Sequence, residues 1–329
     1  MDVTRRAVLK SSVSTVATAG FSGCLGSPEG DRDGSLEGYT AFFTLWDWAE
    51  QVGGEHFSFV NPVDTGQMGH GWSPDGDITR NVASSDAFIY LDSPEFAWAQ
   101  DIAAELQRDY EDITVIDLLG GIESRLQQSE SGHDEEHGGE EFHDPHVWID
   151  PILASEMIES IVDGLVETDP DHEDDYREHA ANYIERIEAV HEAFDTLVDD
   201  AERGVAVLAG HDSFGYLERR YGFDLHTPVG VSPDAAESFE DISGVIETIE
   251  EHDIETVLYD PFEAPDPPDD LPQMVEVIFE HTDVDSAEPL SSVSGTTAEW
   301  EDRGWGWVEQ MEELNLPSLR AALGVEESR

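Results

Sequence analysis

The chain has 329 residues, of which 76 are acidic and 15 are basic, so its formal net charge at pH 7 is −61. This charge excludes a nucleic-acid partner, because a phosphate backbone needs a basic face. It also resembles the charge of disordered chains, but eight tryptophans and regular apolar segments indicate a folded protein. We interpret the acidic excess as a halophilic surface and expect the fold to need high salt, since the Debye length falls to roughly 3 Å at 1 M.

Residues 1–23 are typical of an export signal. The pair Arg5 and Arg6 is followed by an uncharged, moderately apolar stretch and then by small residues. This order predicts secretion, and the stretch is too short and too polar to span a bilayer. The twin arginine predicts export by the Tat route, which moves folded proteins.

Cys24 is the only cysteine, so no intrachain disulfide can form. The small residues before it resemble a lipobox, in which the cysteine becomes the lipidated first residue of the mature protein. We expect Cys24 to anchor the protein to the outer face of the cytoplasmic membrane. Residues 24–37 are rich in Gly, Ser and Asp and predict a flexible tether.

Beyond the tether, strand-like and helix-like segments alternate. Strands are expected over 39–46, 56–63, 86–92, 112–119, 204–210 and 255–260. Helices are expected over 95–110, 150–167, 213–222 and 241–252, and a helical segment, 305–324, closes the chain. This alternation predicts an α/β fold with mainly parallel sheets flanked by helices.

The clearest helix covers residues 172–202, where apolar side chains recur at three- and four-residue steps. A helix of about 30 residues spans roughly 45 Å, which is long for a crossover connection and suits a strut between two lobes. We therefore predict an N-terminal lobe over 38–170, a connecting helix over 171–203 and a C-terminal lobe over 204–329.

Three histidines stand in specific settings far apart in the sequence. They are His70 in GHGWSP, His146 in DPHVWIDP and His211 in LAGHDSFGY. Each follows or opens an apolar segment, and only a tertiary fold could bring them together. Neutral imidazole is the commonest metal ligand among side chains, and ligands in such folds bind where loops leave the C-terminal ends of strands. The sequence thus predicts a preformed metal pocket.

The segment 129–145 carries three further histidines, His133, His137 and His143, among acidic residues and glycines. Tracts of this composition cannot build a core, and they bind divalent metals weakly. We interpret the segment as an auxiliary metal-collecting loop, without calling its histidines ligands of the main site. The alternative is a solvated halophilic loop.

Several motifs in order resemble those of the zinc/manganese-binding receptors of ABC metal importers. They are GHGWSPDGDITRNVASSDAFIYL, DPHVWIDP, AGHDSFGYLERRYGF, VSPDAAESFEDISGVIETIEEHDIETVLYDPF and VEQMEELNLPSLRAALG, and the resemblance covers about residues 38 to 324. It implies two α/β lobes joined by one long helix, with metal held between them and delivered to a membrane permease. It also places the family's three histidine ligands on His70, His146 and His211, and likens 129–145 to the loop of zinc-type members.

The chain departs from this family's pattern in two places. The first motif often reads His-x-Tyr-Glu-Pro, but here Ser73 replaces the carboxylate beside His70. The fourth ligand of the family, where present, is acidic, and Glu288 in AEPLSS is the closest match. Asp260 in LYDPF is the alternative, and water would fill the position if neither residue binds.

Three imidazoles with at most one carboxylate suit tetrahedral zinc, whereas manganese prefers more oxygen ligands. We therefore predict a monomeric, exported receptor for Zn²⁺, with Mn²⁺ as the alternative and iron, cobalt and copper still open. A zinc hydrolase is a rival function, but the chain has no H-E-x-x-H motif and no clear general base, and we expect no enzyme activity. A surface adhesin with a structural metal is a third interpretation.

Overall fold

The computed structural model describes residues 36–69, 71–74, 76–127, 143–229, 239–264 and 271–325. The predictions made for the signal, the lipid anchor, His70, His133 and His137 lie outside these residues. Ser35–Arg329 form one compact unit. Every helix in the described part of the chain is too short or too polar to cross a membrane.

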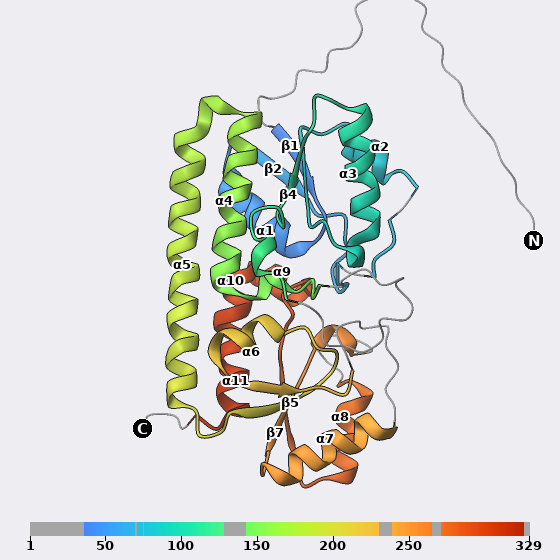
Figure 1. Cartoon of the computed structure of the whole chain (residues 1–329), viewed down its shortest axis with the longest axis vertical. Coiled ribbons are helices and arrows are strands. Elements are labelled where there is room, and N and C mark those ends of the chain that lie inside the picture. The colour runs from blue at the N-terminus through green and yellow to red at the C-terminus, as the bar shows by residue number, and fades with distance from the viewer. Residues whose placement is uncertain are drawn as a thin grey trace, which may run out of the picture. The chain divides into compact units, whose positions relative to one another are not determined.

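The first lobe contains a parallel sheet of four strands (Figure 1). In spatial order these are β2 (Phe57–Val60), β1 (Leu36–Thr40), β3 (Ala87–Tyr90) and β4 (Thr114–Asp117). The helices of this lobe are α1 (Phe43–Gly53), α2 (Ile78–Val82), α3 (Ala97–Asp109) and α4 (Pro151–Thr168). In Figure 1, α4 lies on one side of the sheet and α3 on the other, so both faces are covered.

The second lobe repeats this architecture with a second parallel sheet. In spatial order its strands are β6 (Asp224–His226), β5 (Val205–Ala209), β7 (Thr256–Tyr259) and β8 (Ser286–Pro289). Its helices are α6 (Gly215–Tyr221), α7 (Phe239–Glu251), α8 (Gln273–His281) and α9 (Ala298–Arg303). The prediction of two mainly parallel sheets flanked by helices is confirmed.

The long helix α5 (Glu173–Asp200) runs beside both lobes (Figure 1), contacting α1 and α4 of the first and α6 of the second. Its buried side chains follow the predicted spacing, from Tyr176 through Tyr183 and Ile187 to Leu197. Three acidic residues lie in its first turn, where negative charge interacts favourably with the positive end of the helix dipole. The predicted connecting helix is confirmed.

A second helical run also links the lobes. It consists of α10 (Trp307–Gln310), a π-helical turn (Met311–Asn315) and α11 (Leu316–Ala322). The first part contacts α1 and α5, and the last part contacts β7 and β8. At the turn, the Asn315 side chain donates to the Ser291 carbonyl at 2.8 Å and accepts from the Ser291 amide at 2.8 Å. This exchange fixes the run to the end of β8.

One predicted element needs correction, and three others were missed. The aromatic segment 39–46 was expected to be one strand, but β1 ends at Thr40 and α1 begins at Phe43. The apolar residues of α1 recur with helical spacing, and their burial against the sheet overrides the β-propensity of the aromatic residues. The sequence reading also missed the two edge strands of the second sheet, β6 and β8, and helix α8.

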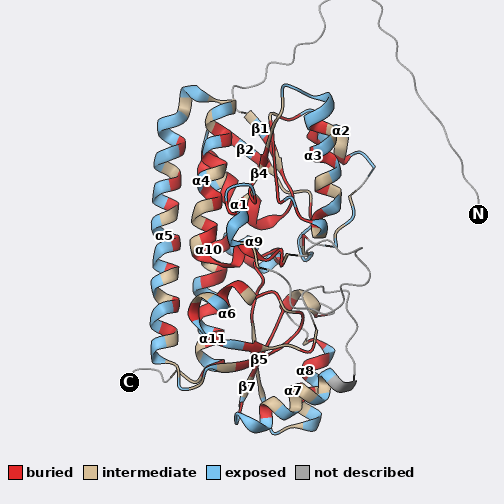
Figure 2. Ribbon diagram, in the orientation of Figure 1, coloured by how far each residue is buried: buried red, intermediate tan, exposed pale blue. Residues whose placement is uncertain are grey.

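Buried residues lie along the sides of the helices that face the sheets and along most of the strands (Figure 2). The larger apolar core includes Trp48, Trp148 and Trp307, all fully buried. Two of the indoles are also hydrogen-bonded: Trp307 Nε1 donates to the Trp148 carbonyl at 2.9 Å, and Trp148 Nε1 donates to the Ser292 carbonyl at 2.8 Å. These bonds join the start of α4, the end of β8 and α10 around one packed centre.

A glycine sets the distance between α4 and the first sheet. Gly164 is buried near the C-terminal end of α4, and a Cβ atom there would overlap the Ile116 side chain of β4. Gly164→Val should therefore lower the free energy of unfolding by about 2–3 kcal/mol. Urea unfolding in multi-molar salt would measure this. Asp163→Val, on the exposed side of α4, is the matched control; an equal loss in both variants would contradict the packing argument.

Candidate metal-binding site

His146 lies in the loop that leads into α4, and only 1% of it is exposed. One oxygen of Asp144, Oδ1, accepts from the His146 backbone amide at 2.9 Å and lies 2.8 Å from Nδ1 of its ring. This carboxylate fixes the orientation of the ring and the identity of the protonated nitrogen. Metal-binding histidines are commonly held in this way, with the opposite nitrogen, Nε2, directed at the ion.

His211 repeats the arrangement in the second lobe. It follows β5, is 1% exposed, and both its backbone amide and its Nδ1 meet Glu263 Oε1, at 3.1 and 2.6 Å. Burial alone would lower the pKa of His211, but the Glu263 carboxylate, with Asp260 and Asp212, raises it above its usual value. A cation that binds Nε2 of His211 therefore competes with a proton for that nitrogen.

The two histidines meet across the lobes. Their ring centroids are 5.5 Å apart, with the planes inclined by 48°. His70, the third predicted ligand, lies outside the described residues. Within the described ranges, no group of three or more His, Cys, Asp or Glu side chains is placed to hold a metal ion. The structure therefore brings together two of the three predicted histidines and does not test the third.

Acidic oxygens surround the histidine pair. Asp212 and Asp260 each bury an oxygen, Oδ1 and Oδ2 respectively, that has no hydrogen-bond partner among the described residues, and the same holds for Ser213 Oγ. The pKa of Asp212 is raised mainly by burial and secondly by the negative charge of Asp144. Burial, followed by the charge of Glu263, raises the pKa of Asp260 to about 7. Burial disfavours the charged form of both carboxylates, and a divalent cation between them would favour it.

The two acidic candidates for a fourth ligand lie at different positions along the strands of the second sheet. Asp260 directly follows β7 and is 1% exposed, and its neighbour Tyr259 pairs with Ala209, two residues before His211. Asp260 and His211 therefore leave the same edge of the sheet. Glu288 lies within β8, level with Leu258, and is half-buried.

Sequence reasoning missed Asp144 and Glu263, which hold the two histidines. Asp144 lies two residues before His146, so its place in the motif was a usable signal. Glu263 lies 52 residues from His211, and only the pairing of β5 with β7 brings it close. Of the loop histidines, His143 is described and half-buried, and its Nδ1 has no hydrogen-bond partner within the described ranges.

The model of a known protein family, described as zinc-uptake complex component A, periplasmic (ZnuA), matches residues 39–315. The chain belongs to this family. ZnuA-family proteins are metal-binding receptors and not enzymes, and this excludes the hydrolase interpretation. The resemblance inferred from the motifs is thereby confirmed at the level of the family.

Two curated relatives of the ZnuA type illustrate the range of similarity. The high-affinity zinc uptake system protein ZnuA of Bacillus subtilis (strain 168) is 24% identical over 316 residues, covering 94% of this chain and 93% of that protein. The zinc-binding lipoprotein AdcA of Streptococcus pneumoniae (serotype 4, strain TIGR4) is 26% identical over 237 residues. That match covers 71% of this chain but only 47% of AdcA, so the chain spans about half of the pneumococcal protein.

Solved structures share the fold. The metal-dependent lipoprotein YcdH of Bacillus subtilis gives a TM-score of 0.72 at 22% identity, covering 88% of this chain and 99% of that one. Zn(II)-bound AdcA of Streptococcus pneumoniae gives 0.72 at 22% identity, covering 90% and 59%. The laminin-binding protein Lmb of Streptococcus agalactiae, described as bifunctional with adhesin and metal-transporting activity, gives 0.73 at 20% identity, covering 88% and 100%. At these identities the likeness establishes the fold.

Proposed function

We propose that this chain is the extracytoplasmic receptor that captures Zn²⁺ and delivers it to the permease of an ABC importer. One observation carries the proposal: a buried histidine from each lobe, His146 and His211, with each Nδ1 held by a carboxylate and the rings 5.5 Å apart. Membership of the zinc-uptake family supports the same conclusion. The ion is the cargo of this site and would enter between the lobes.

The proposed ligands are Nε2 of His146 and of His211, together with His70. For the fourth position the geometry favours Asp260 over Glu288, because Asp260 is fully buried beside His211 and leaves the same edge of the sheet. Water is the remaining possibility. Imidazoles with one carboxylate favour tetrahedral zinc over manganese, and zinc-binding relatives support this order.

The cellular setting of the receptor is also proposed. Arg5 and Arg6 would direct Tat export, and a lipid on Cys24 would hold the monomer at the outer face of the membrane through the tether 24–37. Relatives named as lipoproteins support the anchor. His133, His137 and His143 would collect metal beside the main site, and the acidic surface, with a net charge of −61, would require high salt.

Titration of the metal-stripped protein tests the function. Calorimetry in multi-molar salt should detect one tight zinc site, with manganese binding more weakly. Tighter manganese binding would keep the receptor and overturn the choice of metal. The adhesin interpretation is supported by the similarity to Lmb of Streptococcus agalactiae, which is described as both an adhesin and a metal transporter. It predicts instead a metal that cannot be removed without unfolding the protein.

Zinc affinity should fall steadily as the pH is lowered from 8 to 5. Ligation needs neutral imidazole and ionised carboxylate, and the pKa of His211 is raised while that of Asp260 is raised to about 7. Protons therefore compete with the ion already near neutral pH, and binding near pH 7 should release protons. Competition with a chromophoric chelator, calibrated at each pH, would measure the affinity. A flat profile over this range would contradict the ligand set.

A further inference from the structure

A cavity of about 430 Å³ lies between the two lobes, apart from the histidine pair. Its walls include Arg125, just before the segment 128–142, and Arg219 and Arg220 on α6. The described residues contain ten arginines and no lysine. Three of these ten line one cavity in a chain whose net charge is −61, so the arginines require an explanation beyond a general surface composition.

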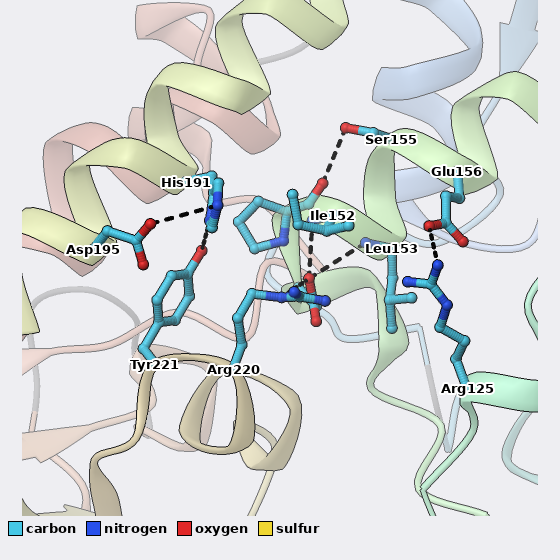
Figure 3. Close-up of polar contacts among 11 residues, drawn as sticks. Arg125, Ile152, Leu153, Ser155, Glu156, His191, Asp195, Arg220 and Tyr221 are labelled. Carbon is cyan, nitrogen blue, oxygen red and sulfur yellow. Dashed lines mark hydrogen bonds and ion pairs between the residues drawn. The ribbon is translucent and has the colours of Figure 1, made fainter.

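Two of the three arginines are held in place by carboxylates (Figure 3). Arg220 Nε lies 2.6 Å from Asp150 Oδ1, and Arg125 Nη2 lies 2.8 Å from Glu156 Oε1. The same Asp150 oxygen accepts from the amides of Ile152 and Leu153 at the start of α4. Each guanidinium has five N–H donors in a planar fork. The carboxylates use only part of each fork and position the remainder.

Arg219 differs from its neighbours. Its side chain is exposed, and it forms no ion pair within the described ranges. The three guanidiniums exceed the two carboxylates, Asp150 and Glu156, by one positive charge. The cavity wall also contains the side chains of Leu153 and Tyr216, and its volume is within the range of small-molecule sites. The cavity thus combines a net positive charge, oriented donors and some apolar surface.

We propose that this cavity binds a small oxyanion, a carboxylate or a phosphate, held by Arg219 together with the unused donors of Arg125 and Arg220. Arginine forks match these groups because two parallel N–H groups meet two oxygens. Arg125 belongs to the first lobe and the other two to the second. A bound anion would therefore bridge the lobes.

The cavity is connected to the histidine pair through Tyr216. The Tyr216 hydroxyl accepts from the Gln127 amide at 2.9 Å and donates to the Asp144 carbonyl at 3.1 Å. Asp144 in turn orients His146. If the proposed function holds, the anion and the metal would be coupled and each would change the affinity of the other by the same factor. Anion binding itself does not depend on the metal.

The test uses the metal-free full chain, so that its outcome does not depend on whether the protein binds zinc. Inorganic phosphate and malonate, a dicarboxylate, are titrated separately by calorimetry in multi-molar KCl. We expect saturable binding of at least one anion. Arg219→Gln should weaken it roughly tenfold or more, the effect of losing a charged hydrogen bond. Arg125→Gln should weaken it similarly, and Arg177→Gln, an exposed arginine on α5, should leave it unchanged.

The matched control separates the site from general effects of salts. Phosphate stabilises most proteins by exclusion from their surface, but that effect does not saturate and is the same in every variant. Binding of phosphate alone or malonate alone would support the site and identify the source of the oxyanion. Absence of saturable binding for both anions, or equal binding by wild type and Arg219→Gln with both variants folded by circular dichroism, would overturn the proposal.

Discussion

Replacing His211 by alanine should remove the tight zinc site, lowering its affinity at least about 100-fold. Loss of a residue that only orients a ligand already costs about 10–100-fold in affinity, and His211 is proposed as a ligand itself. The imidazole is buried, with Glu263 holding its Nδ1 and the His146 ring 5.5 Å away, and alanine would remove the nitrogen that faces the proposed site. Calorimetric titration of stripped wild type and variant would measure the change.

His252→Ala provides the matched control, because this histidine is exposed after α7 and far from the proposed site in the sequence. It should leave the tight site intact. Weak zinc binding that remains in both variants would be assigned to the loop histidines. If His211→Ala kept full affinity while remaining folded, the assignment of this histidine to the site would be wrong.

The largest effect on stability is expected for Asp47→Ala, at about 3–5 kcal/mol. Asp47 lies in α1 and is almost fully buried. Its carboxylate accepts from the Tyr183 hydroxyl at 2.7 Å, on α5, and from the Trp307 amide at 2.8 Å, at the start of α10. The alanine would leave these donors buried without an acceptor and open a cavity where three helices meet. Denaturant unfolding in multi-molar salt would measure the loss.

Two comparisons make this prediction specific. Tyr183→Phe removes one donor but leaves the carboxylate in place, and should cost about 1–2 kcal/mol. Asp101→Ala, at an exposed position of α3, should change stability by about 0.5 kcal/mol or less. A loss below about 1 kcal/mol in Asp47→Ala would show that solvent reaches the site and satisfies the donors.

The sequence predicted the elements whose pattern is local. The interior strands β3, β5 and β7 are short apolar segments, and α5 displays its buried face at helical spacing. The edge strands of the second sheet, β6 and β8, could not be found in this way. β6 has three residues, and β8, with the sequence SAEP, is half-buried throughout. Both are strands because a neighbour offers hydrogen bonds, which is a property of the tertiary fold.

The site shows the same division. The motifs around His146 and His211 singled out both histidines, and the structure places their rings together. The partner of His211 could not be chosen from the sequence, because the chain contains 76 acidic residues and Glu263 becomes its neighbour only through strand pairing. The sequence likewise could not show that the three arginines of the interlobe cavity lie together, because Arg125 precedes α5 and the other two follow it.

The two helical runs that pass between the lobes, α5 and α10–α11, bear on the thermodynamics of ion capture. A receptor that closes on its ligand buries new apolar surface, and the heat capacity of binding then becomes strongly negative. Here two helical runs already contact both lobes, and we expect them to limit closure, so that little additional surface is buried. The enthalpy of zinc binding should therefore change little with temperature once proton release is subtracted. Affinity would come from a pocket that exists before the ion arrives, and no part of the binding energy would be spent on bringing the lobes together.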